Sequence, residues 1–162
     1  MTLKSVPAPL DTGRRRLTFE QPRVMGVLNV TPDSFSDGGL FCAVDRALEQ
    51  ARQLVSEGAD MLDIGGESSR PGAAQVPLEQ ELERVIPVVE AICERFDVPV
   101  SVDTCKPEVA NAAVAAGAEM INDIRALEAS GALEQAAGWG VPICLMHMQG
   151  EPRTMQQSPH YE

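Results

Sequence analysis

The feature that most constrains the fold is an alternation of short apolar segments with longer amphipathic ones. We predict five β-strands, at about residues 23–29, 60–65, 99–103, 118–123 and 141–146. Helices are predicted between them, at residues 43–57, 78–96, 107–116 and 132–137. A helix that separates two strands lets the chain cross back, so that both strands run in the same direction. The pattern therefore predicts an α/β fold built on a parallel sheet.

The helix predictions rest on periodicity and on end signals. In the first helix, apolar residues recur every three or four positions from Val44 to Val55, and Gly58 stands where a helix commonly ends in the left-handed conformation. In the second, Pro87 predicts a kink or a break. The junctions at residues 58–62 (Gly-Ala-Asp-Met-Leu) and 117–121 (Gly-Ala-Glu-Met-Ile) resemble each other, which favours repeated strand–helix units.

The predicted strands share a polar carboxyl end. Parallel strands gather these ends on one edge of the sheet, which is the ligand-binding face of a parallel (β/α) barrel of the TIM type. An open, doubly wound sheet also binds ligands at this edge. The sequence has no GxGxxG motif after a strand, so a dinucleotide-binding fold is less well supported. The strand-end residues are Asn29, Asp63, Asp103, Asn122 with Asp123, and His147.

Composition narrows the class of protein. A chain of 162 residues is long enough for one domain, and its net charge of −11 argues against a nucleic-acid partner or an anionic membrane surface. A small anionic ligand needs only local positive charge and stays possible. The four cysteines form no CxxC pair, and the sequence shows neither a signal peptide nor a membrane-spanning run. We therefore expect a cytoplasmic protein.

The chain divides into an extension, residues 1–22, and a barrel segment, residues 23–162. The extension contains three prolines and no sustained period. We predict a short hairpin in it that pairs residues 3–6 with residues 17–19.

Long motifs at the predicted strand ends resemble those of dihydropteroate synthases. One is Met-Gly-Val-Leu-Asn-Val-Thr-Pro-Asp-Ser-Phe-Ser-Asp-Gly-Gly at residues 25–39, and another is Asp-Ile-Gly-Gly-Glu-Ser-Ser-Arg-Pro-Gly at residues 63–72. Shorter matches follow in the same order at residues 101–104, 121–124 and 145–150. The resemblance implies an eight-stranded TIM-type barrel, of which this chain holds about the first five strands. It also implies an enzyme, a transferase of folate biosynthesis that joins para-aminobenzoate to hydroxymethyl-dihydropterin diphosphate and is the sulfonamide target.

The resemblance implies roles for individual residues. Asp103 and Asn122 would pair with the pterin ring, although each could instead be a strand-end cap. Asn29 would ligate Mg²⁺ on the diphosphate, and Asp37 would join it when the loop closes. Arg70 would stabilise the departing pyrophosphate, although it could also be a surface arginine.

A second implied group surrounds para-aminobenzoate. It consists of Phe35, Ser69 and Pro71. Threonine is commoner in the family where this chain has Ser69, so the hydroxyl is kept and a methyl group is lost. Cys105, where relatives often have serine, is expected to be neutral.

The length of the chain leaves alternatives open. The family's later segments supply a further acid, a lysine, an arginine and a histidine to the site, together with the usual homodimer contact, and none has a counterpart here. We therefore expect residues 1–162 alone to be inactive. Two other functions remain: a different pterin-binding transferase, such as a methyltetrahydrofolate methyl-transfer domain, or a non-catalytic half-barrel that binds a partner.

Overall fold

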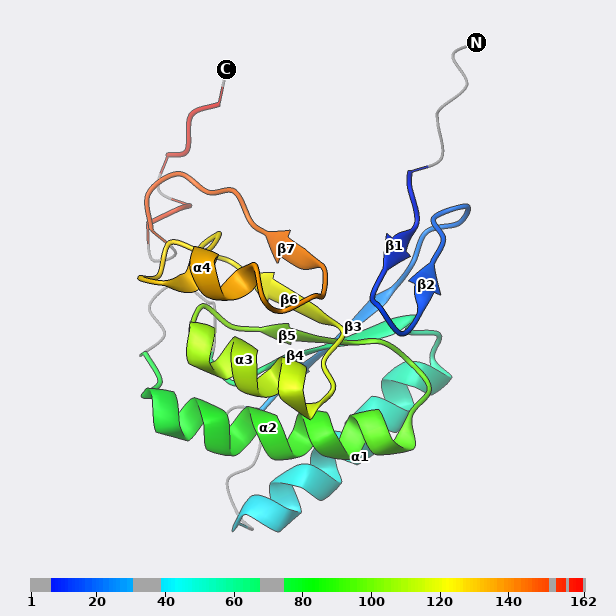
Figure 1. Cartoon of the computed structure of the whole chain (residues 1–162). Helices are drawn as coiled ribbons and strands as arrows, with labels where there is room; N and C mark the ends of the chain where they lie inside the picture. Colours follow the sequence, from blue (N-terminus) through cyan, green and yellow to red (C-terminus); the bar gives the residue numbers. More distant parts are fainter. Residues whose placement is uncertain (1–6, 31–38, 68–74, 152–153, 157, 162) are drawn as a thin grey trace.

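The fold is a parallel sheet covered by helices on one face (Figure 1). The computed structural model describes residues 7–30, 39–67, 75–151, 154–156 and 158–161, with side chains from residue 43 onward in the first helix. Five strands lie side by side in chain order, and every neighbouring pair is parallel. They are β3 (Met25–Asn29), β4 (Met61–Gly65), β5 (Val100–Asp103), β6 (Met120–Asp123) and β7 (Ile143–Leu145). The predicted α/β class, with part of a TIM-type barrel, is confirmed.

Four helices follow the strands, as the periodicity predicted. They are α1 (Gly39–Ser56), α2 (Leu78–Arg95), α3 (Pro107–Ala116) and α4 (Ala132–Ala136). Consecutive helices contact one another, and α1, α2 and α3 lie on the same side of the sheet (Figure 1). The core lies between the two layers, where Leu62, Ile64 and Val102 from strands meet Val85 and Ile92 from α2. Burial of these apolar side chains is the main stabilising contribution.

The prediction of a break at Pro87 was wrong. Helix α2 runs without interruption from Leu78 to Arg95, with Pro87 inside it. Proline removes one backbone hydrogen bond, to the carbonyl of Glu83. The flanking residues Val85 and Val88 are fully buried against the sheet, and this packing holds the helix together across the missing bond.

The amino-terminal hairpin is present, but its first strand differs from the prediction. Strand β1 (Leu10–Asp11) pairs with β2 (Arg16–Leu17). Leu17 therefore lies opposite Leu10, whereas we predicted that it would pair with a residue in the range 3–6. Residues 3–6 themselves lie outside the described part of the chain. The turn between the strands contains Gly13 at φ +83°, a left-handed conformation that glycine adopts without strain.

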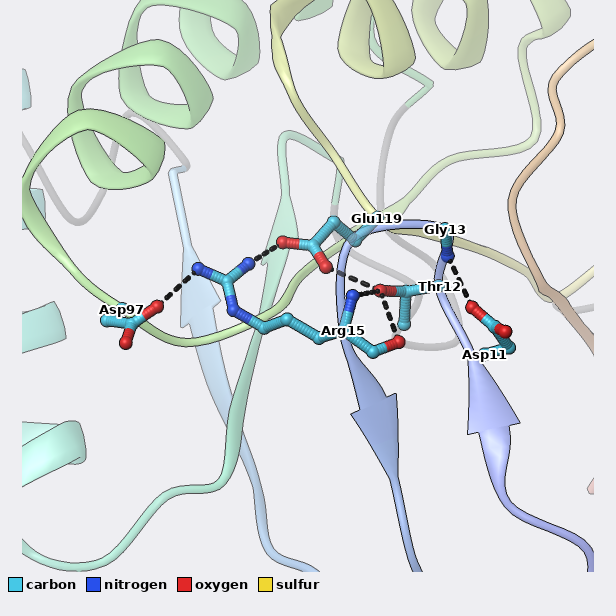
Figure 2. Close-up of polar contacts among 6 residues, drawn as sticks. All are labelled: Asp11, Thr12, Gly13, Arg15, Asp97 and Glu119. Carbon is cyan, nitrogen blue, oxygen red and sulfur yellow. Dashed lines mark hydrogen bonds and ion pairs between the residues drawn. The ribbon is translucent and has the colours of Figure 1, made fainter.

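One buried acid fastens this hairpin to the amino edge of the sheet, by which we mean the edge where β4–β7 begin. Glu119, which directly precedes β6, is 3% exposed. It accepts a hydrogen bond of 2.5 Å from the Thr12 hydroxyl and forms an ion pair with Arg15 (Figure 2). Arg15 also binds Asp97 at 2.7 Å. The hairpin is therefore held by side chains as well as by its own strand pairing.

Candidate functional site

Three of the predicted strand-end residues, Asn29, Asp103 and Asn122, share one row across the sheet. In the strand register Asn29 lies opposite Gly65, Gly65 opposite Asp103, and Asp103 opposite Asn122. Residues paired in this way project from the same face of the sheet. On β3 that face is the exposed one, since Gly26 and Leu28 are buried on the helix side while Val27 and Asn29 are exposed. The structure therefore brings Asn29, Asp103 and Asn122 together at the carboxyl edge, where the strands end.

Two polar residues lie on the same face as this row, two positions earlier in their strands. Asp63 was among the predicted strand-end residues but was given no role in the site, and Ser101 was missed. Asp63 and Ser101 lie opposite each other in the register and are almost completely buried. Asp63 Oδ2 accepts a hydrogen bond of 3.1 Å from Asn122 Nδ2. Asp63 Oδ1 and Ser101 Oγ have no hydrogen-bond partner among the described residues. Buried polar atoms normally have partners, so these two atoms suit a bound molecule. An acid inside the apolar strand Met61–Gly65 was the signal that could have identified Asp63.

The electrostatics of the row centre on Asp103. Burial has the largest effect on the pKa of Asp103, followed in order by the negative charges of Asp63, Glu81, Asp123 and Glu67, and together they raise this pKa to about 7. A carboxyl group with this pKa changes its protonation state near neutral pH. Asp103 is therefore suited to recognise a ligand whose donor groups favour the ionised carboxylate.

Lys106 supplies positive charge close to these acids. Its ammonium group binds Glu67 at 2.5 Å and also binds Glu81, which is completely buried on helix α2. Burial alone would lower the pKa of Lys106, but its hydrogen bonds with the two glutamates outweigh burial and raise the pKa. Lys106 therefore stays protonated and balances part of the charge of the carboxyl edge.

The turn after β6 is held by Asp123, which is 2% exposed. Its two carboxylate oxygens accept hydrogen bonds from the backbone N–H groups of Arg125, at 2.8 Å, and Leu127, at 2.9 Å. Ala126 and Leu127 have backbone φ angles of +51° and +63°, which residues other than glycine rarely adopt. Backbone strain of this kind often occurs next to functional groups, here within five residues of Asn122.

No side chain stands between Asn29 and Asp103 in the row, because the residue between them is glycine. Gly65 separates Asn29 from Asp103 in the row, and a Cβ atom there would lie 3.7 Å from Asn29 Oδ1 and 3.8 Å from Asp103 Oδ2. Any larger side chain would fill the gap between the two residues. In the described part of the chain, His, Cys, Asp and Glu side chains form no group of three or more arranged to bind a metal. The Asn29 amide oxygen is a neutral oxygen donor of the kind that Mg²⁺ accepts, and its role as a metal ligand stays a prediction.

The remaining predicted site residues lie outside the described part of the chain. These are Phe35, Asp37, Ser69, Arg70 and Pro71. Their roles stay predictions.

Two further features are not part of the row of Asn29, Asp103 and Asn122. His147 is exposed beyond β7 and packs edge to face with Tyr161, with ring centroids 5.8 Å apart. A cavity of about 250 Å³ lies at the amino edge and is lined in part by Arg15, Cys93 and Glu119. Arg15 and Glu119 in its lining bind each other. We assign the function to the carboxyl edge, where Asp63 Oδ1 and Ser101 Oγ are buried without a partner among the described residues.

Comparison with known families decides the relationship. The sequence pattern of the family described as pterin-binding enzyme matches residues 25–162. The chain belongs to this family. The match includes every strand of the parallel sheet and excludes the β1–β2 hairpin. Pterin-binding enzymes therefore provide the frame in which the carboxyl edge is interpreted below.

Individual pterin-binding enzymes are similar over nearly the whole chain. Dihydropteroate synthase of Escherichia coli K12 is 58% identical over 146 residues, which cover 90% of this chain and 52% of the relative. The crystal structure of Yersinia pestis dihydropteroate synthase with a sulfonamide drug matches with a TM-score of 0.86 and 56% identity, covering 95% of this chain and 56% of that one. The structure of Xanthomonas albilineans dihydropteroate synthase with 4-aminobenzoic acid matches with a TM-score of 0.84 and 55% identity, covering 98% of this chain and 55% of that one. The chain thus spans about half the length of the relatives it matches.

Proposed function

We propose that the protein containing this chain is a dihydropteroate synthase, which joins para-aminobenzoate to hydroxymethyl-dihydropterin diphosphate and releases pyrophosphate. The observation that carries the proposal is the row of Asn29, Asp103 and Asn122 at the carboxyl edge, directly above Asp63 and Ser101. The likeness to dihydropteroate synthases at 58% identity supports it. The crystal structures of relatives with a sulfonamide and with 4-aminobenzoic acid support the choice of substrates.

The polar groups of the row match the edge of a pterin. The aminopyrimidinone part of the ring carries N–H donors beside a carbonyl acceptor. An ionised Asp103 accepts from adjacent donors, and Asn122 offers both an amide donor and an amide acceptor. The unpartnered Asp63 Oδ1 and Ser101 Oγ supply further hydrogen-bonding positions below the ring. Recognition by several buried polar groups selects strongly against ligands that leave one unpaired.

The diphosphate is negatively charged and requires positive charge at the carboxyl edge. Asn29 would hold Mg²⁺ through its amide oxygen, alongside phosphate oxygens and water, as this small hard ion prefers. When bound, the ion neutralises charge on the leaving group. Arg70 would bind the same phosphates through its guanidinium group, and Asp37 would approach as the first loop closes. Phe35, Ser69 and Pro71 would form the wall around para-aminobenzoate.

The reaction is a substitution at the exocyclic methylene carbon of the pterin. The bond from this carbon to the diphosphate oxygen breaks, and pyrophosphate leaves with the electron pair. The electron-rich pterin ring stabilises the positive charge that develops on the carbon. The aromatic amine of para-aminobenzoate then forms the new carbon–nitrogen bond and releases a proton to solvent. Closure of the loops around the site would exclude water, which competes as a nucleophile.

Other properties follow from the same proposal. Mg²⁺ is the proposed cofactor, and the full-length protein is proposed to form a homodimer like its family. The described cysteines Cys93, Cys105 and Cys144 are all free, which suits the reducing cytoplasm we propose. Among the described helices, none is both long and apolar enough to cross a membrane.

The test is incorporation of radiolabelled para-aminobenzoate by the protein expressed from its complete gene. Dihydropterin diphosphate and Mg²⁺ are supplied, and labelled dihydropteroate is the expected product. Methyl transfer from methyltetrahydrofolate, without para-aminobenzoate incorporation, would instead identify a methyl-transfer domain. A protein with neither activity that still captures a partner would be the non-catalytic half-barrel.

A further inference from the structure

A chain of hydrogen bonds joins helix α2 to the ends of β5 and β6. The Thr104 hydroxyl donates to Glu81 Oε1 at 2.6 Å and accepts from the backbone N–H of Lys106 at 3.2 Å. The Lys106 ammonium group binds the other carboxylate oxygen of Glu81. The backbone N–H of Thr104 donates to the carbonyl of Asn122 at 3.1 Å. Thr104 directly follows Asp103 in the chain and is hydrogen-bonded to Asn122. Through Thr104, the carboxylate of Glu81 is therefore connected to both of these residues.

Glu81 is a firm anchor for this chain of contacts. Its side chain is completely buried in the first turn of α2, and the next turn packs the fully buried Val85 against the sheet. The chain after β4 also passes close to it, since a Cβ atom at Gly66 would lie 2.6 Å from Val85 and 3.0 Å from Glu81. Only glycine fits there. A buried carboxylate is costly unless it is paired and hydrogen-bonded, so Glu81 has to keep both Thr104 and Lys106 in place.

We propose that Glu81 is a positioning residue of the pterin site: by holding Thr104 and Lys106, it fixes the turn after β5 and with it the side chains of Asp103 and Asn122. The inference rests on the proposed function, because it assigns to Glu81 the orientation of the two residues that would bind the pterin. Glu81 itself lies on the helix side of the sheet and touches no substrate. Its influence is on pterin affinity rather than on the departure of pyrophosphate or on para-aminobenzoate.

The charge arrangement gives Glu81 a second effect on the same row. The acids whose negative charge acts on Asp103 are Asp63 from β4, Glu67 from the segment after it, Glu81 from α2 and Asp123 from β6. Lys106 is the basic group that pairs with two of them. If Glu81 released Lys106, the ammonium group would keep only Glu67 as its partner, and the balance of charge around Asp103 would change.

The test compares matched threonine variants at the two edges of the sheet. Thr104→Val removes the hydroxyl that Glu81 holds, and Thr104→Ser keeps it. Thr12→Val is the control, because the Thr12 hydroxyl donates to the buried Glu119 in the same way at the amino edge. Binding of 6-hydroxymethyl-7,8-dihydropterin is measured by calorimetry in the protein expressed from its complete gene, together with Tm and the KM of each substrate.

The expected result separates positioning from stability. Thr104→Val should weaken pterin binding by about tenfold and raise the KM for the pterin substrate, while the KM for para-aminobenzoate is unchanged. Thr104→Ser should bind like the parent. Thr12→Val should lower Tm as much as Thr104→Val and leave pterin affinity unchanged. Lys106→Met is a second variant. It removes the other partner of Glu81 and keeps the apolar part of a side chain that is 26% exposed, with an expected fivefold loss of affinity.

Two different outcomes would contradict us, and they can be told apart. A parent protein that does not bind pterin would disprove the proposed function, and the positioning inference would fail with it. A parent that binds pterin, with Thr104→Val and Lys106→Met binding equally well, would overturn only the role of Glu81. The proposed function would then stand, and the network would serve stability alone.

Discussion

Two buried glutamates, at opposite edges of the same sheet, are built alike and serve different purposes. Glu81 at the carboxyl edge and Glu119 at the amino edge each accept a hydrogen bond from a threonine hydroxyl, and each pairs with a basic side chain. Each basic side chain binds a second acid as well. At the amino edge that acid, Asp97, is 98% exposed, whereas Glu67 at the carboxyl edge is 30% exposed.

The difference lies in what each glutamate connects. Glu119 joins residues more than 100 positions apart and attaches the hairpin (Figure 2). Glu81 connects to residues 23 and 25 positions away and holds the turn between two site strands. The same set of contacts therefore closes one end of the fold and orders the other. The amino edge is completed by residues of this chain, whereas in our proposal the carboxyl edge is completed by a ligand and by later strands.

The largest expected effect concerns residues 1–162, which contain both edges, when they are expressed on their own. A polypeptide of residues 1–162 alone should incorporate no para-aminobenzoate and should not be a well-folded monomer. Strands β3 and β7 each have one neighbour in the described sheet, and exposed apolar residues such as Val27 and Leu145 lie on them. Unpaired strands invite pairing with other chains. Sedimentation and the incorporation assay check both statements; a monodisperse, active monomer would contradict them.

Much of this architecture could be predicted from the sequence, for identifiable reasons. Asn29, Asp103 and Asn122 follow short apolar runs, which can be recognised in the local sequence. Parallel pairing of the strands then places these residues at one edge of the sheet. The burial of Glu81 and Glu119 cannot be recognised in this way. An acid in the first turn of an amphipathic helix, or at the start of a strand, is commonly solvated, and only the tertiary partners Thr104 and Thr12 reveal otherwise.

The hairpin and the proline show the same limit. Two-residue strands carry too little pattern to fix their register, so Leu17 was assigned to the wrong partner. Pro87 was expected to interrupt its helix because its local cost is known, whereas the packing of neighbouring valines that offsets the cost depends on the sheet. At Pro87 tertiary burial overrode local preference, whereas in the hairpin the local pattern was too short to decide the register.

The second prediction concerns stability at the amino edge. Glu119→Ala should lower the free energy of unfolding by about 3 kcal/mol, because it leaves Arg15 and Thr12 without their buried partner. Pterin affinity should stay the same, since the hairpin lies at the opposite edge. Urea unfolding measures the free energy of unfolding, and calorimetry measures pterin affinity. A matching loss of pterin affinity would break the distinction between the two edges.

The third prediction separates binding from stability at the carboxyl edge. Asp103→Asn should weaken pterin binding by on the order of 1–3 kcal/mol, because it replaces an acceptor with a donor in a buried site. The same change should stabilise the unliganded protein at pH 8. Asp103 has a folded-state pKa of about 7 against an ordinary value of 3.8, so the folded chain retains a proton that the unfolded chain has lost between these pH values.

The sign of the pH effect follows from this retained proton. The free energy of unfolding should fall as pH rises from about 4 to 7 and level off above that range. Asp103→Asn should remove this fall, with a gain on the order of 1–3 kcal/mol at pH 8 and none at pH 4. Denaturant titrations at the two pH values test it. Equal stability of parent and variant at both would show that Asp103 is not held in a buried, acidic setting.

The fourth prediction concerns the ion. Asn29→Ala should reduce Mg²⁺-dependent binding of pyrophosphate about tenfold, or about 1.4 kcal/mol, while the affinity for the pterin alone changes less. Titrating pyrophosphate with and without Mg²⁺ gives both values. Val27→Ala, on the same face of β3, is the control for a general disturbance of the strand. Superimposable Mg²⁺ curves for Asn29→Ala and the parent would remove Asn29 from the metal site.

The smallest expected effect tests backbone strain at the two edges. The turn at the amino edge uses glycine at its positive φ, Gly13, whereas the carboxyl edge uses Ala126 and Leu127. A left-handed conformation costs an L-residue about 1 kcal/mol or more, and glycine gives back part of the gain through its greater freedom in the unfolded chain. Ala126→Gly should therefore raise the free energy of unfolding by about 0.5 kcal/mol, while Gly13→Ala should lower it by about 1 kcal/mol. Thermal unfolding of both variants checks the signs. If Ala126→Gly also weakens pterin binding, the strained turn contributes to holding Asn122, and the carboxyl edge is ordered from both β5 and β6.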